Sequence, residues 1–267
     1  MVLFPNGKIN LGLHVTGKRK DGFHDVETIF YPVAIHDVVE IIAAVESSFA
    51  SSGIDVDGSP ANNLCVKAYD LLKKDFPRLP PVAIQLYKNI PVGAGLGGGS
   101  ADAVACLQLL DQLGGLALST EQISVYALAL GSDCPFFLKN RPCLATGRGE
   151  ILSELKVDLS AYEILIVNPG IHINTGWAFA ALEVLSAGTD LKEIISRPID
   201  RWKDSLHNDF EKIVFNKYPA IEALKADLYK LGAVYSSLSG SGSTVYGLFG
   251  KKERPDVHFP SHFFKWI

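Results

Sequence analysis

The sequence predicts an α+β fold in two domains. Its 267 residues exceed the length that one hydrophobic core usually organises, so we expect two domains, placed at 1–155 and 156–267. The first half combines segments of alternating apolar and polar residues, typical of strands, with two longer helical segments that would cover one face of the resulting sheet. Hydrophobic residues make up 48% of the chain and charged residues 20%, which is ordinary for a globular protein.

The N-terminal segment is predicted to be a strand because every second residue from 9 to 15 is apolar. The residues between them share the opposite face of that strand: Lys8, Asn10, Gly12 and His14. A charged turn at 18–25 contains an Asp-Gly pair, which is a hairpin signal. The turn would lead into a second strand at Val26–Ile35.

Five glycines lie where a predicted strand, Val82–Ile90, meets a helix that runs toward Gly114, with Ser100 as its expected cap. Glycine lets backbone N–H groups approach an anion closely, and a helix N-terminus supplies partial positive charge. The sequence therefore predicts a nucleotide phosphate site here, which we call the glycine segment. Its residues are Pro91, Val92, Gly93, Ala94, Gly95, Leu96, Gly97, Gly98, Gly99, Ser100 and Ala101.

Two better-known glycine loops do not fit this segment. Gly93, Gly95 and Gly98 satisfy the dinucleotide pattern, but that pattern needs a second strand ending in an acidic residue roughly 20 residues further on. A Walker A loop needs Gly-Lys followed by Ser or Thr, and no lysine lies between Lys88 and Lys139. The remaining alternative is a tight turn without a ligand, although each interior glycine costs about 0.5–1 kcal/mol and five together require a reason.

Downstream segments complete the predicted organisation. A capping box of Ser119 and Gln122 begins a helix at 119–130 that Gly131 ends. Ser47–Ala61 is expected to be a loop with short strand character at best. The second domain would contain strands at Tyr162–Val167, Ala233–Leu238 and Val245–Phe249, and helices near Gly176–Ser186, Leu191–Ser196, Leu206–Asn216 and Pro219–Leu231. No regular periodicity is visible in 251–267.

Composition excludes several classes of protein. The net charge of −4 argues against a nucleic-acid partner, and no apolar run approaches the ~18 residues that span a bilayer. We therefore expect a cytoplasmic protein with a small-molecule partner and neither nucleic acid nor membrane. The four cysteines are scattered without a C-x-x-C pair, which favours buried free thiols: Cys65, Cys106, Cys134 and Cys143.

Five segments give the chain a resemblance to the GHMP kinase superfamily. They are Lys8-Ile-Asn-Leu with Thr16-Gly and Asp21-Gly-Phe-His24, the glycine segment, Gly131-Ser-Asp-Cys-Pro135, Asn208-Asp-Phe-Glu211, and Ser239-Gly-Ser-Gly242. The resemblance implies a ribosomal protein S5 domain 2-like N-terminal domain, a ferredoxin-like C-terminal domain, and ATP with Mg²⁺. Magnesium ligands are not evident, although the Ser100 hydroxyl is a candidate.

The resemblance is strongest to members that phosphorylate the position-2 hydroxyl of 4-diphosphocytidyl-2-C-methyl-D-erythritol in the non-mevalonate isoprenoid route. Mevalonate and galactose kinases carry a Glu-His pair after the first strand, whereas this chain reads Gly12-Leu-His-Val15. A homoserine or mevalonate type of kinase is the nearer alternative. A non-catalytic nucleotide-binding module is the farther one, and intact Lys8 and Asp133 argue against it.

The resemblance also implies two catalytic residues. Asp133 would take the proton of the substrate hydroxyl, and Lys8 would offset charge that develops on the transferred phosphoryl group. From the residues alone, Asp133 is an N-cap ahead of Pro135, which is compatible with the catalytic role. The corresponding alternative for Lys8 is a solvated lysine at a strand start.

Six residues match positions that hold the substrate in the family: Asn10, Phe23, His24, Arg148, Thr175 and Phe179. Phe23, His24 and Phe179 would hold the cytosine ring, although most relatives carry tyrosine at the first position. Phe179 is equally a candidate core aromatic, and Arg148 an exposed turn arginine. Asn10 would contact the methylerythritol end, and Thr175 would hold the substrate or the turn at 239–242.

Overall fold

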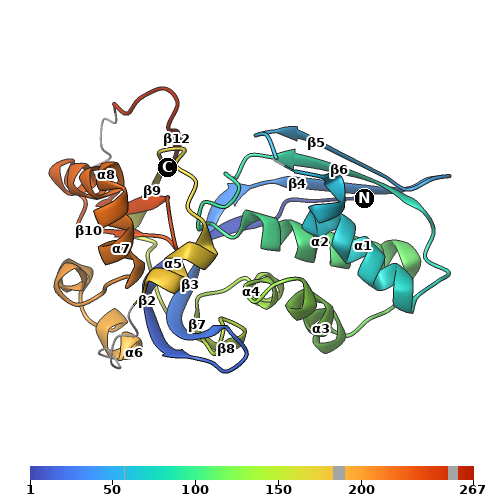
Figure 1. Cartoon of the computed structure of the whole chain (residues 1–267), viewed down its shortest axis with the longest axis horizontal. Helices are drawn as coiled ribbons and strands as arrows, with labels where there is room; N and C mark the ends of the chain where they lie inside the picture. The colour runs from blue at the N-terminus through green and yellow to red at the C-terminus, as the bar shows by residue number, and fades with distance from the viewer. Residues whose placement is uncertain (57, 183–189, 252–257) are drawn as a thin grey trace. The chain divides into compact units, whose positions relative to one another are not determined.

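The computed structural model describes residues 1–56, 58–182, 190–251 and 258–267. The chain forms two compact units that interleave along the sequence (Figure 1). The first comprises Met1–Lys8, Pro32–Val92 and Gly97–Asn140, and the second comprises Ile9–Tyr31, Gly93–Leu96 and Arg141–Ile267. Each unit is made of segments that are distant in the sequence. The predicted division into contiguous domains, 1–155 and 156–267, is therefore not tested by these units and stays a prediction.

The first unit contains a sheet in the order β1-β4-β6-β5, made of Val2–Leu3, Val38–Ala43, Val82–Lys88 and Ser48–Gly53. The predicted strand at Val82–Ile90 is confirmed as β6. The loop expected at Ser47–Ala61 is corrected in part, because β5 pairs with β6 in parallel from Ser48 opposite Ala83 to Gly53 opposite Lys88. Backbone pairing to a neighbour makes this serine-rich segment a strand despite its weak intrinsic preference.

Four α-helices of the first unit are α1 (Leu64–Asp75), α2 (Gly98–Gly114), α3 (Thr120–Leu130) and α4 (Cys134–Lys139), and α1 and α2 lie along the sheet (Figure 1). A short 3₁₀ helix, η1, covers Pro60–Asn62. The capping box of Ser119 and Gln122 is confirmed. The expected cap at Ser100 is wrong, because α2 already begins at Gly98. Gly97, with a φ of +70°, is its N-cap, and its carbonyl accepts from the N–H of Ala101 at 3.0 Å.

The two predicted N-terminal strands are confirmed as β2 (Asn6–Lys18) and β3 (His24–His36). Most of each strand belongs to the second unit, and residues 6–8 and 32–36 are assigned to the first. The two strands form a sheet in the order β2-β3-β7-β8 with β7 (Cys143–Thr146) and β8 (Ile151–Glu154). A second sheet has the order β10-β11-β9-β12, made of Tyr235–Leu238, Val245–Gly250, Tyr162–Asn168 and Phe264–Trp266. The predicted strands of this half are therefore confirmed, and the C-terminal tail contributes β12.

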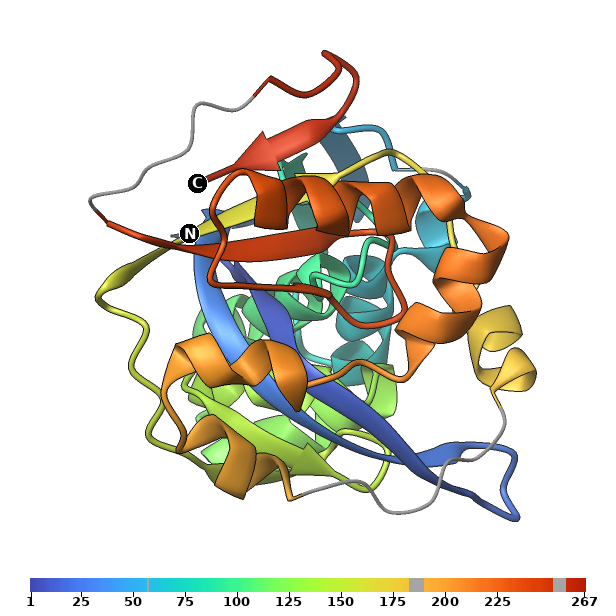
Figure 2. The ribbon, with the colours of Figure 1, turned by 90° about the vertical axis from the view of Figure 1, so that its left-hand side faces the viewer.

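The helical elements of this unit are α5 (Thr175–Ala181), α6 (Leu191–Ile195), η2 (Ile199–Asp204), α7 (Phe210–Lys217) and α8 (Pro219–Lys230). Figure 2 shows α8 lying against the β10-β11-β9 sheet, and side chains of α7, α8 and these strands form one buried cluster. The helix expected at Gly176–Ser186 ends at Ala181, and residues 183–186 lie outside the described residues.

The helix expected at Leu206–Asn216 begins only at Phe210. The reason is that the residues before it bond to β2. The N–H of Leu13 donates to His207 O at 3.0 Å, and the N–H of Asp209 donates to Leu13 O at 2.8 Å. Backbone groups that pair with a strand cannot also form the first turn of a helix.

The four cysteines are buried free thiols, as predicted. Within the described residues, no helix combines the length and the apolar character that crossing a membrane requires.

Candidate active site

Lys8 and Asp133 form an ion pair in the first unit, with 3.4 Å between Lys8 Nζ and Asp133 Oδ2. Lys8 is 3% exposed, so the alternative of a solvated lysine is wrong. Burial lowers the pKa of Lys8, and the nearby Asp133 carboxylate opposes that change. The Asp133 side chain is 36% exposed. The pair thus joins a desolvated ammonium group to a carboxylate that solvent reaches.

Asp133 occupies the N-cap position of α4, as the sequence predicted, and Pro135 follows in the first turn. Its side chain nevertheless makes no capping hydrogen bond to the helix. The carboxylate is oriented toward Lys8 instead of being used by the backbone of its own helix. Asp133 therefore retains the hydrogen-bond acceptors that a general base needs.

The glycine segment enters the first unit at the start of α2, where side chains surround the glycines. A Cβ atom built on Gly97 would lie 2.9 Å from Phe137 Cζ and 3.1 Å from Lys8 Cγ. Gly97 also has a φ of +70°, which L side chains rarely adopt. Only glycine fits this position, and it brings the N-terminus of α2 beside Lys8. Backbone N–H groups at a helix N-terminus favour an anion.

The residues Gly93–Leu96 of the glycine segment belong to the second unit and contact the second glycine turn, by which we mean Leu238–Thr244. Gly95 has a φ of +81°, and a Cβ atom on it would lie 2.0 Å from Ser239 O. Ser239 Oγ donates to Gly95 O at 2.8 Å, and the N–H of Thr244 donates to Ala94 O at 3.3 Å. Two glycine turns, far apart in the sequence, are thus held against each other by direct hydrogen bonds.

Asn10 is 2% exposed and is fixed by three neighbours. Its Nδ2 donates to Thr28 Oγ1 at 2.9 Å, and its backbone N–H donates to Ser239 Oγ at 3.3 Å. Tyr246 OH donates to Asn10 O at 2.8 Å. Ser239 Oγ also lies 3.5 Å from Asn10 Oδ1, so both ends of the Asn10 amide have partners within the second unit, which suits a residue that discriminates a polar ligand.

The predicted aromatic residues do come together. The rings of His24 and Phe179 are stacked with centroids 5.0 Å apart and an interplanar angle of 22°. Phe179 also packs edge to face on the core residue Phe210 at 4.9 Å, so it is both a core aromatic and part of an aromatic pair. The Phe23 ring is 51% exposed, and Arg148 Cζ lies 4.7 Å from its centroid. Arg148 is half-buried over this ring and is not an exposed turn arginine.

Thr175, at the start of α5, hydrogen-bonds to the second glycine turn. Its Oγ1 lies 3.1 Å from Ser241 Oγ. Of the two predicted roles for Thr175, this contact matches the one in which it holds the turn, and contact with the substrate stays a prediction.

Sequence reasoning missed a buried charged triad in the first unit, formed by Lys88, Asp37 and Asp102. Lys88 Nζ hydrogen-bonds to Asp37 Oδ2 and, at 2.7 Å, to Asp102 Oδ2. Asp37 Oδ1 also accepts from the backbone N–H groups at 89 and 90, at 2.6 and 2.8 Å. The triad joins β6 to α2 directly behind the glycine segment, since a Cβ on Gly98 would lie 3.2 Å from Lys88 Nζ.

One signal for this triad was present in the sequence. Lys88 lies an even number of residues from Val82, Ile84 and Leu86, so its side chain is on the same face of β6 as theirs. Alternation alone therefore places Lys88 on the buried face of the strand. A lysine at a buried strand position requires a carboxylate partner.

Comparison with known proteins agrees with the fold. The family model "GHMP kinases N terminal domain" matches residues 63–141, and "GHMP kinases C terminal" matches residues 190–257. The chain is 50% identical over 256 residues to 4-diphosphocytidyl-2-C-methyl-D-erythritol kinase of Azobacteroides pseudotrichonymphae, covering 96% of each chain. It is 48% identical to the Bacteroides fragilis protein of the same name, covering 95% of this chain and 94% of that one.

A solved structure of 4-(cytidine 5'-diphospho)-2C-methyl-D-erythritol kinase superposes with a TM-score of 0.80 at 29% identity, covering 95% of this chain and 92% of that chain. The fold is thus that of a small-molecule kinase with mixed α and β structure. The chain belongs to the GHMP kinase family.

Proposed function

We propose that this protein transfers the γ-phosphoryl group of ATP to the position-2 hydroxyl of 4-diphosphocytidyl-2-C-methyl-D-erythritol. The products are the 2-phosphate and ADP, and the reaction belongs to the non-mevalonate route to isoprenoid precursors. The observation that carries the proposal is the near-complete coverage, at 48–50% identity, by two relatives named for kinase activity on this alcohol. The Lys8–Asp133 pair supplies the chemistry that such a reaction needs.

Phosphoryl transfer depends on positioning and charge stabilisation more than on covalent help from the protein. Asp133 accepts the proton as the O–H bond of the substrate breaks and its oxygen bonds to the γ-phosphorus. The bond from phosphorus to the bridging oxygen breaks at the same centre, and ADP leaves. The Lys8 ammonium group, held out of water, stabilises negative charge on the transferred group more strongly than a solvated lysine would.

The glycine segment would hold the phosphates of ATP. Gly95 and Gly97 have positive φ, and a Cβ atom on either would clash with protein atoms, of Ser239 and of Phe137 respectively. Glycine therefore allows the close packing that would fix the backbone of this segment for the phosphates. Mg²⁺ would accompany ATP and neutralise phosphate charge. Mg²⁺ that accompanies a nucleotide usually takes most of its ligands from phosphate and water oxygens, and Ser100 is the candidate protein hydroxyl.

The substrate would be held by residues of the second unit. The exposed face of Phe23 and the His24–Phe179 stack offer aromatic surface to a cytosine ring. Arg148, beside Phe23, would reach the base or a phosphate of the same ligand. Asn10 would contact the methylerythritol end, and Thr175 would act through the second glycine turn.

Phosphate transfer to a panel of alcohols tests this function. The purified protein would be incubated with ATP, Mg²⁺ and either the cytidylyl alcohol, homoserine or mevalonate, and products followed by ³¹P NMR and mass spectrometry. We expect a phosphomonoester only with the cytidylyl alcohol. Transfer to homoserine or mevalonate in its place would assign the other kinase class, and no transfer to any alcohol would indicate a nucleotide-binding module. The cytoplasmic location and the absence of nucleic-acid and membrane partners stay predictions.

A further inference from the structure

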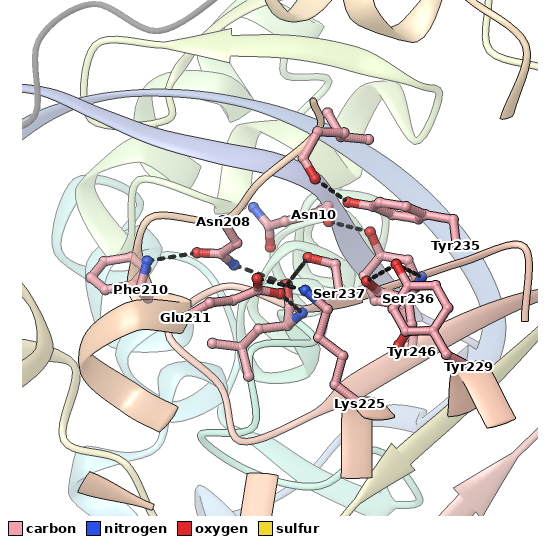
Figure 3. A network of polar contacts seen from close by, with 12 residues as sticks. Asn10, Asn208, Phe210, Glu211, Lys225, Tyr229, Tyr235, Ser236, Ser237 and Tyr246 are labelled. Atoms are coloured by element: carbon pink, nitrogen blue, oxygen red, sulfur yellow. Dashed lines mark hydrogen bonds and ion pairs between the residues drawn. The ribbon is translucent and has the colours of Figure 1, made fainter. Parts of the chain in front are cut away.

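The second glycine turn is held from behind by Asn208, which no catalytic step uses. Asn208 is 2% exposed. Its Nδ2 donates to the carbonyl oxygens of Leu238 at 2.9 Å and Gly240 at 2.8 Å. Those two carbonyls flank Ser239, so one side chain fixes the backbone on both sides of that serine. Figure 3 shows Asn208 within the surrounding polar network.

Glu211 fixes the strand end that leads into the turn. Its Oε1 accepts from Ser237 Oγ and from the N–H of Leu238, both at 3.0 Å. Its Oε2 pairs with Lys225 Nζ at 2.7 Å. Figure 3 shows the side chains of Glu211, Ser237 and Lys225 converging. Both carboxylate oxygens are thus occupied, and hydrogen bonds to a charged group are stronger than neutral ones.

The segment that carries these two residues is itself attached to β2. Asn208 Oδ1 accepts from the N–H of Phe210 at 3.0 Å, at the start of α7. Asp209 Oδ2 accepts from the N–H of Val15 at 2.8 Å, and Leu13 forms an isolated parallel bridge with Asn208. Asn208 and Glu211, which hold the turn, are therefore themselves anchored by a strand and a helix and not by another loop.

On its other side, the turn contacts residues proposed to bind ligands. Ser239 Oγ holds Gly95 O at 2.8 Å and accepts from the N–H of Asn10 at 3.3 Å. A Cβ atom on Gly240 would lie 3.2 Å from Gly95 Cα, so the two backbones are already in close contact. Even a small shift of the turn would therefore displace Gly95 and Asn10, the two residues proposed to bind ligands.

We propose that Asn208 and Glu211 are positioning residues for nucleotide and substrate binding. They hold the second glycine turn in the place from which Ser239 orients Gly95 and Asn10. This inference rests on the proposed function for its effect on the alcohol, whereas its effect on ATP affinity can be measured without any reaction.

The first test is Asn208→Asp, which keeps the shape and the Oδ1 acceptor for Phe210 but replaces the amide donor by an oxygen facing two carbonyls. We expect the dissociation constant of ATP, measured by calorimetry, to rise about tenfold or more, the scale of one or two buried hydrogen bonds left unmade. KM for the alcohol should rise as well. The matched control is Asn216→Asp, which makes the same change at an exposed position of α7. Its ATP affinity should equal that of the wild type.

A double-mutant cycle with Gly240→Ala separates positioning from general destabilisation. Gly240 has a φ of +57°, and alanine there would push the turn away from Gly95. If Asn208 acts through the turn, the two substitutions together should weaken ATP binding by less than the product of their separate fold-changes. Should Asn208→Asp fail to fold, Glu211→Gln takes its place in the cycle, because it removes the charge that Lys225 pairs with from the second support of the turn.

Three results would overturn the inference: wild-type ATP affinity in a folded Asn208→Asp variant, wild-type affinity in Gly240→Ala, or fold-changes that simply multiply. Failure of the wild type to phosphorylate the cytidylyl alcohol would instead remove the proposed function. It would leave the comparison of ATP affinities intact.

Discussion

Lys8 Nζ lies 3.4 Å from Asp133 Oδ2, and the two groups differ sharply in exposure, with side chains 4% and 36% accessible. A lysine removed from water is costly unless a counter-charge is close, so Asp133 stabilises the charged form of Lys8. Solvent and a hydroxyl group can still reach the carboxylate. One residue is therefore suited to stabilise charge and the other to accept a proton.

The first prediction is that Asp133→Asn abolishes turnover while ATP still binds. The amide has nearly the same shape, but it cannot take a proton at neutral pH. Steady-state kinetics and ATP calorimetry on the same preparation measure the two effects. Activity within tenfold of the wild type would remove Asp133 from the role of general base.

The second prediction concerns Lys8→Met, which fills a similar volume without charge. We expect kcat to fall roughly 10²-fold with a smaller effect on KM, because the charge acts mainly in the transition state. Thermal stability should stay level or rise, since a desolvated ammonium group is removed. If the whole loss appeared in KM, Lys8 would be a binding residue only.

Sequence patterns predicted the elements that depend on local chemistry. The capping box at Ser119, the alternating strand β2 and the glycine segment were all found, because caps, alternation and glycine clusters are signals carried by neighbouring residues. β5 was expected to be no more than a loop with strand character, because its pairing with β6 is a tertiary effect. The late start of α7 has the same origin, since β2 takes the backbone groups of the residues before Phe210.

The candidate site was predicted through motifs. Asn208 and Glu211 also stand in one of these motifs, but their role as supports was not predicted. The residues quoted from the motifs, such as Lys8 and Asp133, were identified in advance, and the structure pairs them. The roles of Asn208 and Lys88 depend on partners distant in the sequence, which a single chain without its fold does not reveal. For Lys88, only its place on the apolar face of the predicted strand indicated that its side chain is buried.

The third prediction compares two glycines with positive φ at opposite ends of α2. Gly97 has a φ of +70° and is crowded by Phe137 and Lys8, whereas Gly115 has a φ of +57° and nothing within 4 Å of a Cβ atom. Gly115→Ala should lower stability by about 1 kcal/mol from backbone strain, and Gly97→Ala by more, because its Cβ atom would also press on Phe137 and Lys8. Only Gly97→Ala should also weaken ATP binding in calorimetry. Equal ATP affinity in the two folded variants would contradict a phosphate site at this end of the helix.

The fourth prediction is a pH dependence of stability that comes from Asp102. Desolvation raises the pKa of Asp102 to about 7; Lys88 opposes this rise and the Asp37 charge adds to it. Between the usual carboxyl pKa and about 7, the folded protein binds a proton that the unfolded chain has lost, so this group makes stability fall as pH rises through that window.

Urea unfolding at a series of pH values measures this effect in Asp102→Asn against the wild type. The difference in free energy of unfolding between the variant and the wild type should change between about pH 4 and pH 7 and stay constant above about pH 7. The matched control is Asp70→Asn, at an exposed position on α1. Its free energy of unfolding should depend on pH in the same way as that of the wild type. A constant difference for Asp102→Asn across the window would show that Asp102 keeps its charge in the folded protein.

The last prediction tests the substrate. The Phe23 ring is 51% exposed under the Arg148 guanidinium, so Phe23→Ala removes little packing from the fold. If the ring stacks on cytosine, the substitution should cost about 1–3 kcal/mol in binding of the cytidylyl alcohol and leave ATP affinity unchanged. Phe23→Tyr should be neutral or slightly better, because it keeps the ring and adds a phenol that can hydrogen-bond. Phe4→Ala is the control, since Phe4 is 65% exposed and belongs to no proposed site. Wild-type KM for the cytidylyl alcohol in Phe23→Ala would leave the kinase chemistry of Lys8 and Asp133 in place but would remove Phe23 from recognition of the base.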